Sequence, residues 1–252
     1  VHGDGQSDMA DAVVEEIKAA GGQAIANKAS VTDVEGAKSI VDDAVSAFGT
    51  VDILVNNAGI LRDKSYKNMT IDEFDLVLDV HLRGSNLVTR AAWPVMYEKN
   101  WGRIVFTSST SGIFGNFGQA NYGAAKMAML GFMNVLAIEG ASHNVRVNCL
   151  APGAATRMTA SVPGSTFDAD NPPAEMDPSL VSPAVLYMCS EDAPSAVTIH
   201  ASGGRYSRSQ TYVNEGIALG PEATFDEMMD SIDGVMDMSA STPLDPVNRR
   251  RG

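Results

Sequence analysis

Basic residues and long apolar runs are scarce in this sequence of 252 residues. Lysine and arginine total 18 against 31 aspartates and glutamates, which gives a formal net charge of -13. Because so many acidic groups repel a phosphodiester backbone, a general nucleic-acid-binding function is disfavoured. No apolar run approaches the roughly 20 residues that a membrane-spanning helix needs, and no signal peptide is recognisable. We therefore expect neither nucleic-acid nor membrane partners.

Cysteine is also scarce. Cys149 and Cys189 both stand among apolar residues, without the spacing of a disulfide framework, which predicts a reduced intracellular protein. The sequence ends Arg249-Arg250-Arg251-Gly252, which is not a peroxisomal tripeptide, so we predict a cytoplasmic location. The histidines show no metal-ligand spacing, and no metal site is expected. They are His2, His81, His143 and His200.

Helical and extended patterns alternate along the chain. Extended runs separated by helices of ten residues or more favour parallel pairing with right-handed crossovers, so the sequence predicts an α/β fold with a doubly wound parallel sheet. The run 51–56 is typical of a strand buried on both faces. The expected helices are 9–20, 32–48 with Thr32 as N-cap, 71–80, 85–98 and 120–140. The expected strands are 23–27, 51–56, 103–108, 145–150 and 197–201.

The later part of the chain changes character. Residues 153–178 are rich in Ala, Thr, Pro and Asp and follow a late strand, where a substrate lid or a plain surface loop would lie. The run 197–201 is expected to be the last strand, and 225–234 has the pattern of an acidic amphipathic helix. We therefore expect one Rossmann-like domain over 1–204 and a C-terminal extension over 205–252.

One segment carries a candidate for proton chemistry. Tyr122 and Lys126 are four residues apart in a helical pattern and so share one helix face. An ammonium beside a phenol favours the phenolate and would lower the pKa of Tyr122 from about 10 toward the working pH. Ser109 ends a strand, where its hydroxyl could bind a substrate oxygen. Such a Tyr/Lys pair alone is often an exposed surface pair without a function, but its coincidence with the serine favours a catalytic site.

These residues, with Asn56-Asn57-Ala58-Gly59 and Pro152-Gly153, resemble the short-chain dehydrogenase/reductase family. The resemblance implies a Rossmann-like domain and NAD or NADP as cofactor, with NAD favoured. It implies that Tyr122 is the general acid/base, that Lys126 lowers its pKa and holds the nicotinamide ribose, and that Ser109 orients the reacting oxygen. The cofactor-binding residues implied by the resemblance are Asn57, Ala58, Gly59, Tyr122, Lys126, Pro152, Gly153 and Thr156.

A narrower resemblance involves His81. The family usually has asparagine at this position, whereas His81-Leu-Arg-Gly-Ser85 and the approach 115–122 are similar to the (3R)-hydroxyacyl-CoA dehydrogenase branch, which includes the dehydrogenase part of peroxisomal multifunctional enzyme type 2 and single-domain bacterial relatives. His81 would complete the proton path from Lys126 to solvent, or be a hydrogen-bonded structural histidine; both interpretations stay open.

The family's opening strand and its Gly-x-x-x-Gly-x-Gly turn, which hold the cofactor pyrophosphate, have no match here. We therefore expect an N-terminally truncated chain that lacks the first strand of its sheet. The acid that ends the family's second strand also has no counterpart, which removes the main signal between NAD and NADP. Lys28-Ala29-Ser30-Val31 stands where the family has an aspartate near the adenine.

The resemblance implies an oxidoreductase of fatty acid metabolism that transfers a hydride between a nicotinamide cofactor and C3 of an acyl thioester, (3R)-hydroxyacyl-CoA to 3-oxoacyl-CoA. A 3-oxoacyl-carrier-protein reductase and a hydroxysteroid dehydrogenase are alternatives with the same chemistry. An alternative of another class is a catalytically silent fragment that keeps the association helices. In the family, helices such as 85–98 and 120–140 pair across a two-fold axis, which implies a homodimer or homotetramer.

Overall fold

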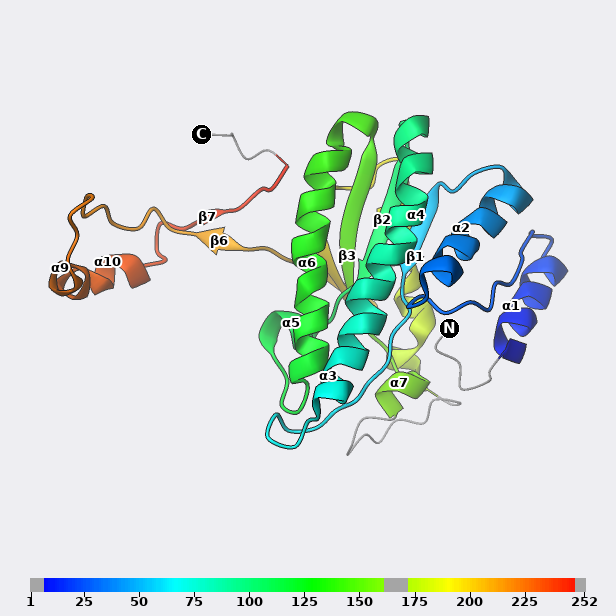
Figure 1. Ribbon diagram of the computed structural model, residues 1–252, viewed down its shortest axis with the longest axis horizontal. Helices are drawn as coiled ribbons and strands as arrows, with labels where there is room; N and C mark the ends of the chain where they lie inside the picture. The colour runs from blue at the N-terminus through cyan, green and yellow to red at the C-terminus, as the bar shows by residue number, and fades with distance from the viewer. Residues whose placement is uncertain (1–6, 161–171, 248–252) are drawn as a thin grey trace.

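A five-stranded sheet forms the centre of the protein in the computed structural model, which describes residues 7–160 and 172–247 (Figure 1). Its strands lie in the order β1-β2-β3-β4-β5. The first four pair in parallel and the fifth pairs antiparallel with β4. This confirms the predicted α/β class with a mostly parallel sheet. The strands are β1 (Ile53–Asn56), β2 (Gly102–Thr107), β3 (Val145–Gly153), β4 (Thr198–Ser202) and β5 (Arg205–Ser209).

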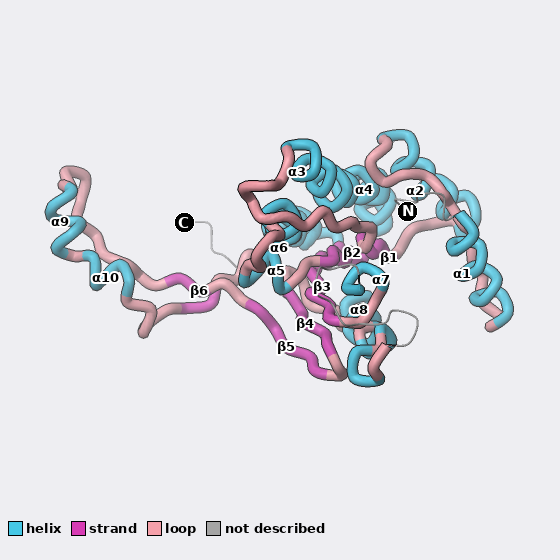
Figure 2. Tube along the Cα trace, turned by 90° about the horizontal axis from the view of Figure 1, so that it is seen from below, coloured by secondary structure: helices cyan, strands magenta, loops and turns pink. Residues whose placement is uncertain are grey.

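Helices cover both faces of the sheet (Figure 2). One face carries α2 (Val34–Phe48), α4 (Gly84–Lys99) and α6 (Ala120–Gly140), and the other carries α8 (Ser182–Cys189). A short helix, α3 (Ile71–Leu78), runs through a π-helix (Asp79–Arg83) directly into α4, while α1 (Ser7–Ala19) lies beyond α2. The described residues form three buried apolar clusters: a larger one under the three helices, a smaller one under α8, and a third where α3 meets α6.

The larger cluster explains the long helix α6. Met129, Met133 and Leu136 of α6 pack on Phe106 and Val147 of the sheet. By length and composition alone, residues 120–143 could cross a membrane, and within the described ranges they are the one helix that could. A core helix passes the same test, because its inner face must be apolar to pack on the sheet.

The structure corrects three expectations near the N-terminus. Residues 23–27 form no strand, and no described strand lies beside them to complete a ladder. The N-cap of α2 is Asp33 rather than Thr32, since the Asp33 carboxylate accepts from the amide of Gly36 at 2.6 Å. β1 is an edge strand of the described sheet and is not buried on both faces, with Ile53 47% and Val55 41% exposed.

The C-terminal region also differs. β4 is not the last strand, because Gly203 and Gly204, both with positive φ, turn the chain into β5. The sheet thus continues past residue 204, and the chain leaves the body after Ser209 as an arm (Figures 1 and 2). The predicted helix 225–234 is two short helices that meet at Ser231. The arm contains β6 (Tyr212–Val213), α9 (Phe225–Asp230), α10 (Ile232–Met236) and β7 (Thr242–Pro243).

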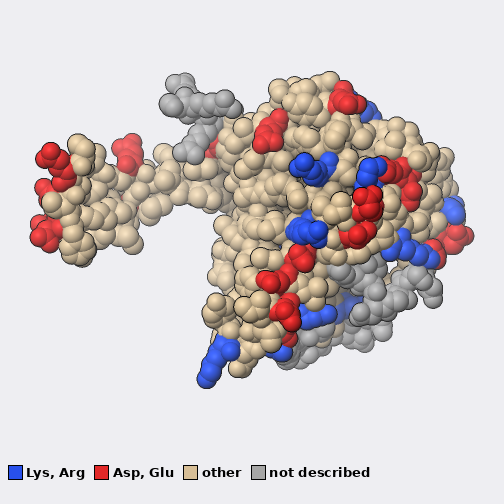
Figure 3. All heavy atoms as spheres, in the orientation of Figure 1, with Lys and Arg blue, Asp and Glu red and all other residues tan. Residues whose placement is uncertain are grey.

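The arm carries acidic side chains at its tip, whereas the visible face of the body carries both signs (Figure 3). The expected lid 153–178 falls partly outside the described residues. Its described part contains α7 (Arg157–Ala160) and two turns of 3-10 helix at Ala174–Met176 and Pro178–Leu180. The backbone amide of Ala155 donates to the carbonyl of Met176, which joins the two described ends of this segment.

Candidate active site

The candidate catalytic residues meet where β2 ends. Thr107 is the last residue of β2, and Ser109 caps the short helix α5 (Thr110–Phe114) by accepting from the amide of Ser111 at 3.1 Å. The first turn of α6 brings Tyr122 and Lys126 alongside. Since the carboxyl ends of parallel strands form the ligand-binding edge of an α/β sheet, this is the expected place for a site.

Tyr122 lies in a narrow, mostly buried environment. Its ring meets His81 edge-on, with 5.2 Å between the ring centroids and an interplanar angle of 84°. Burial raises the pKa of the Tyr122 phenol above 10, a hydrogen bond with the Ser109 side chain lowers it, and the charge of Asp63 raises it. Ser109 and Tyr122 therefore lie side by side, while the predicted role of Ser109 toward a substrate oxygen stays a prediction.

Lys126 is only 3% exposed, and its ammonium donates to the backbone carbonyl of Thr107 at 2.6 Å. The Nζ atom lies 5.5 Å from the centroid of the Tyr122 ring. Burial lowers the pKa of Lys126 to about 7. The ammonium is thus directed at the Thr107 carbonyl, and the lowering of the Tyr122 pKa by Lys126 stays a prediction.

His81 belongs to the π-helix and is almost fully buried. Its Nε2 lies 3.1 Å from the amide nitrogen and 2.9 Å from the carbonyl oxygen of Ile60. A Cβ on Gly59 would lie 2.3 Å from Cε1 of His81, so only glycine permits this approach. These contacts support a structural role for His81 in fixing the turn after β1. A part in the proton path stays a prediction.

Part of the predicted cofactor-binding set surrounds the end of β1. Asn57 Oδ1 accepts from the Thr107 hydroxyl at 2.9 Å, and Asn57 and Ala58 line a hollow of about 130 Å³ between β1 and α4. Lys126 has three N–H donors, and among the described residues only the Thr107 carbonyl accepts from it. Buried donors that Thr107 does not use fit the hydroxyl-rich ribose of a nicotinamide cofactor.

The other predicted cofactor residues follow β3. Pro152 and Gly153 pair with Ala201 and Ser202 of β4. A Cβ on Gly153 would lie 2.5 Å from the Ser202 hydroxyl, so glycine allows β4 to come this close. Thr156 leads into α7, and its amide donates to the Thr159 hydroxyl at 2.7 Å. Their roles toward a cofactor stay predictions.

Sequence reasoning missed three polar residues beside Tyr122. Asn121 is fully buried and donates to the carbonyls of Arg62 and Glu73, and Gln119 donates to the carboxylate of Asp63. Asn121 stands next to Tyr122 in the printed sequence, but nothing local shows that its partners lie 59 and 48 residues earlier, in a loop and in α3. Only the fold brings them together.

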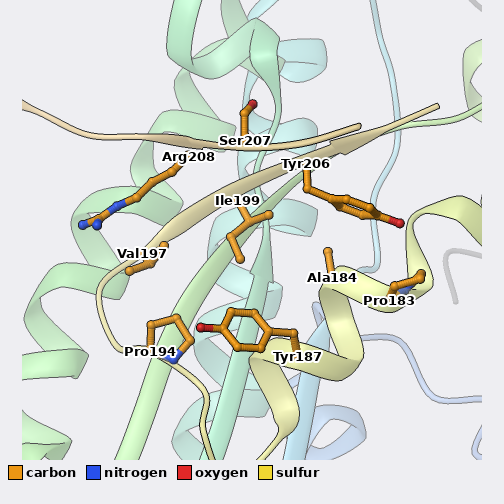
Figure 4. A pocket seen from close by; sticks show the side chains of 9 residues that line it. All are labelled: Pro183, Ala184, Tyr187, Pro194, Val197, Ile199, Tyr206, Ser207 and Arg208. Carbon is orange, nitrogen blue, oxygen red and sulfur yellow. The ribbon is translucent and has the colours of Figure 1, made fainter. Parts of the chain in front are cut away.

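A larger cavity, of about 560 Å³, lies elsewhere, between α8 and the hairpin of β4 and β5 (Figure 4). Its walls are mainly apolar and include Pro183, Tyr187, Ile199 and Tyr206. None of the candidate catalytic residues lines it. Size alone therefore does not identify the site.

Comparisons with known proteins agree with this geometry. A family model described as short chain dehydrogenase matches residues 1–165, which is more than half of the chain. The chain belongs to the short-chain dehydrogenase family. Its relatives are dehydrogenases, and we assign it as a nicotinamide-dependent oxidoreductase, with NAD or NADP as the cofactor.

Two relatives and one structure illustrate the similarity. A short-chain type dehydrogenase/reductase from Mycobacterium tuberculosis is 45% identical over 212 residues, covering 83% of this chain and 72% of that protein. The peroxisomal multifunctional enzyme type 2 of Drosophila melanogaster is 44% identical over 257 residues, covering 99% of this chain and 42% of that protein. The structure of that full-length enzyme superposes with a TM-score of 0.77 at 37% identity, covering 94% of this chain and 41% of that one. The chain therefore spans less than half the length of this multifunctional relative.

Proposed function

We propose that the chain interconverts (3R)-hydroxyacyl-CoA and 3-oxoacyl-CoA, with NAD as the preferred cofactor. The observation that carries the proposal is the group formed at the end of β2 by the buried Tyr122 and Lys126 and the partly buried Ser109. Support for the acyl thioester comes from the 44% identity to an enzyme named peroxisomal multifunctional enzyme type 2. The resemblance of residues 81–85 and 115–122 to the (3R)-hydroxyacyl-CoA branch supports the same substrate.

In oxidation, Ser109 holds the substrate hydroxyl by a hydrogen bond, and Tyr122, ionised to the phenolate, accepts its proton and becomes the phenol. The bound cofactor supplies the hydride acceptor. Lys126 binds the cofactor ribose with the N–H donors that Thr107 does not use. The Tyr122 ring lies against His81 and is largely buried, and this burial limits the access of water that would compete for the proton. In reduction the phenol returns the proton to the 3-oxo group.

We further propose a cytoplasmic homodimer or homotetramer built through α4 and α6. The outward face of α6 supports this, because Val135 is 52% and Ile138 is 43% exposed on a helix that otherwise packs in the core. Residues of both helices, among them Trp93 and Pro94 of α4 and Val135 of α6, line a groove of about 490 Å³. Sedimentation of the purified chain would measure the state, and a monomer at micromolar concentration would refute it.

The substrate is tested by comparing kcat/KM for (3R)- and (3S)-hydroxyacyl-CoA, a hydroxyacyl-carrier-protein and a hydroxysteroid, each with NAD and NADP. We expect the (3R)-CoA substrate with NAD to have the highest value. Equal or faster turnover of the carrier-protein or steroid substrate would replace the proposed substrate while keeping the chemistry. A folded chain that binds neither cofactor would refute the enzymatic role.

A further inference from the structure

A polar clasp joins two segments beside the candidate proton carrier. The amide of Lys64 donates to the carbonyl of Gly118 at 2.9 Å, and the Asn121 side chain donates to the carbonyl of Arg62 at 3.0 Å. These bonds tie the loop after β1 to the first turn of α6, where Tyr122 lies. The loop and the tyrosine are thereby held in one arrangement.

Asp63 stands at the centre of this clasp. One carboxylate oxygen, Oδ2, accepts from Nε2 of Gln119 at 2.7 Å, and Oε1 of Gln119 in turn accepts from Asn116 at 3.0 Å. The other oxygen, Oδ1, is buried and has no hydrogen-bond partner within residues 7–160 and 172–247. A buried carboxylate oxygen left unsatisfied is costly, so its retention calls for a functional explanation.

We propose that Asp63 is a positioning residue of the reaction: held by Gln119, it fixes the first turn of α6 and places a negative charge beside Tyr122. This inference rests on the proposed proton exchange at Tyr122. A negative charge beside a phenol disfavours the phenolate, and Asp63 acts on the pKa of Tyr122 in that direction. The charge therefore adds to the effect of burial, which favours the protonated phenol that can donate to a 3-oxo group.

The other groups around Tyr122 leave this role to Asp63. His81 approaches from the π-helix, edge to ring, and Lys126 lies one turn along α6, bonded to the Thr107 carbonyl. From α3 the apolar Val77 and Leu78 pack here, and the carboxylate of Glu73 is paired with Lys64. Among the described groups that act on the ionisation of Tyr122, Asp63 is the one that bears a negative charge.

Three variants separate charge from clasp. Asp63→Asn keeps a carbonyl oxygen for Gln119 and removes the charge, while Gln119→Met removes the hydrogen-bond donor and keeps the charge. Asp75→Asn neutralises an exposed acid on α3 that has no part in the clasp. The readout is the pH dependence of kcat for hydroxyacyl-CoA oxidation. We expect its acid limb to move to lower pH in Asp63→Asn, to stay in place with lower kcat in Gln119→Met, and to be unchanged in Asp75→Asn.

A second readout needs neither substrate nor turnover. Difluorotyrosine at position 122 has a more acidic phenol, which ionises at a pH that the fold tolerates, and its phenolate absorbs separately from the other tyrosines. We expect its titration midpoint to be lower with Asp63→Asn than with Asp63, and unchanged with Asp75→Asn. If Asp63→Asn fails to fold by circular dichroism, Asp63→Ser provides the neutral side chain.

An unchanged midpoint in the neutral variant would overturn the inference, as would an equal shift in Asp75→Asn. Failure of the proposed function has a different signature. In that case the chain turns over no hydroxyacyl-CoA, yet the midpoint of the labelled tyrosine still moves with the charge at position 63.

Discussion

Replacement of Asn121 by alanine tests whether the buried amide holds the site together. Asn121 is fully buried and its side chain makes three hydrogen bonds: to the carbonyls of Arg62 at 3.0 Å and Glu73 at 3.1 Å, and from the amide of Tyr122 at 2.7 Å. Asn121→Ala removes all three, although the Glu73 carbonyl lies within α3 and keeps its helical partner. The variant is expected to loosen the loop 60–73 from α6.

The magnitude follows from these bonds. Each intramolecular hydrogen bond contributes about 1 kcal/mol net, and an unsatisfied buried group costs about 1–3 kcal/mol. Water can reach the Arg62 side of the contact, because Arg62 is exposed, so the three contributions do not add at full value. We expect a loss of about 2–4 kcal/mol in the free energy of unfolding.

Urea denaturation followed by circular dichroism measures this loss. Asn134→Ala is the matched control, since Asn134 lies on the same helix, is only partly buried and has no described side-chain hydrogen bond. Alanine favours the helix there by a few tenths of a kcal/mol, so the control is neutral or slightly stabilised. A loss below about 1 kcal/mol for Asn121→Ala would show that the amide does not fasten the loop.

Two further predictions concern buried cations. Between about pH 7 and 9 Lys126 is protonated in the unfolded chain and largely neutral in the folded chain, so the free energy of unfolding rises with pH across this window. Lys126→Met lacks this pH dependence. Its stability advantage over the parent should therefore shrink from pH 6 to pH 9, as measured by urea titrations. The same variant should weaken NADH binding by roughly 10- to 100-fold in a fluorescence titration, through the lost ammonium donors. Arg103 is fully buried and its guanidinium donates to carbonyls of four residues, Gly102, Asn144, Ser190 and Glu191, which the single ammonium of Arg103→Lys cannot match. We expect a cost of about 2–4 kcal/mol and a lower melting temperature, and an unchanged melting temperature would show that these bonds contribute little.

The sequence predicted the regular elements best where one face is strongly apolar. The helix 120–140 has the bounds that the pattern indicates, because its inner residues from Met129 to Ala137 form an apolar face. Burial of β1 could not be predicted, since Ile53–Asn56 has the same apolar composition whether one or both of its edges are paired. The prediction of a strand at 23–27 was wrong for a related reason. A strand forms only beside a partner strand, and local composition does not show whether a partner is present.

In the candidate site, too, some residues could be predicted from the sequence and others could not. Ser109, Tyr122 and Lys126 could be identified from spacing and resemblance, and the fold brings them together. The roles of Asn121 and Asp63 depend on contacts with residues far away along the chain. The rise in the pKa of Tyr122 could not be predicted either, because its largest cause is burial, which depends on the packed fold.

The most direct test of the account is the Tyr122→Phe variant, measured for NADH binding and for single-turnover oxidation of (3R)-hydroxyacyl-CoA. Phenylalanine keeps the ring against His81 and removes only the hydroxyl that exchanges the proton. The account predicts unchanged cofactor affinity and a rate lower by on the order of a thousandfold. A variant that binds NADH and oxidises the substrate at the parent rate would contradict the assignment of Tyr122 as the proton carrier.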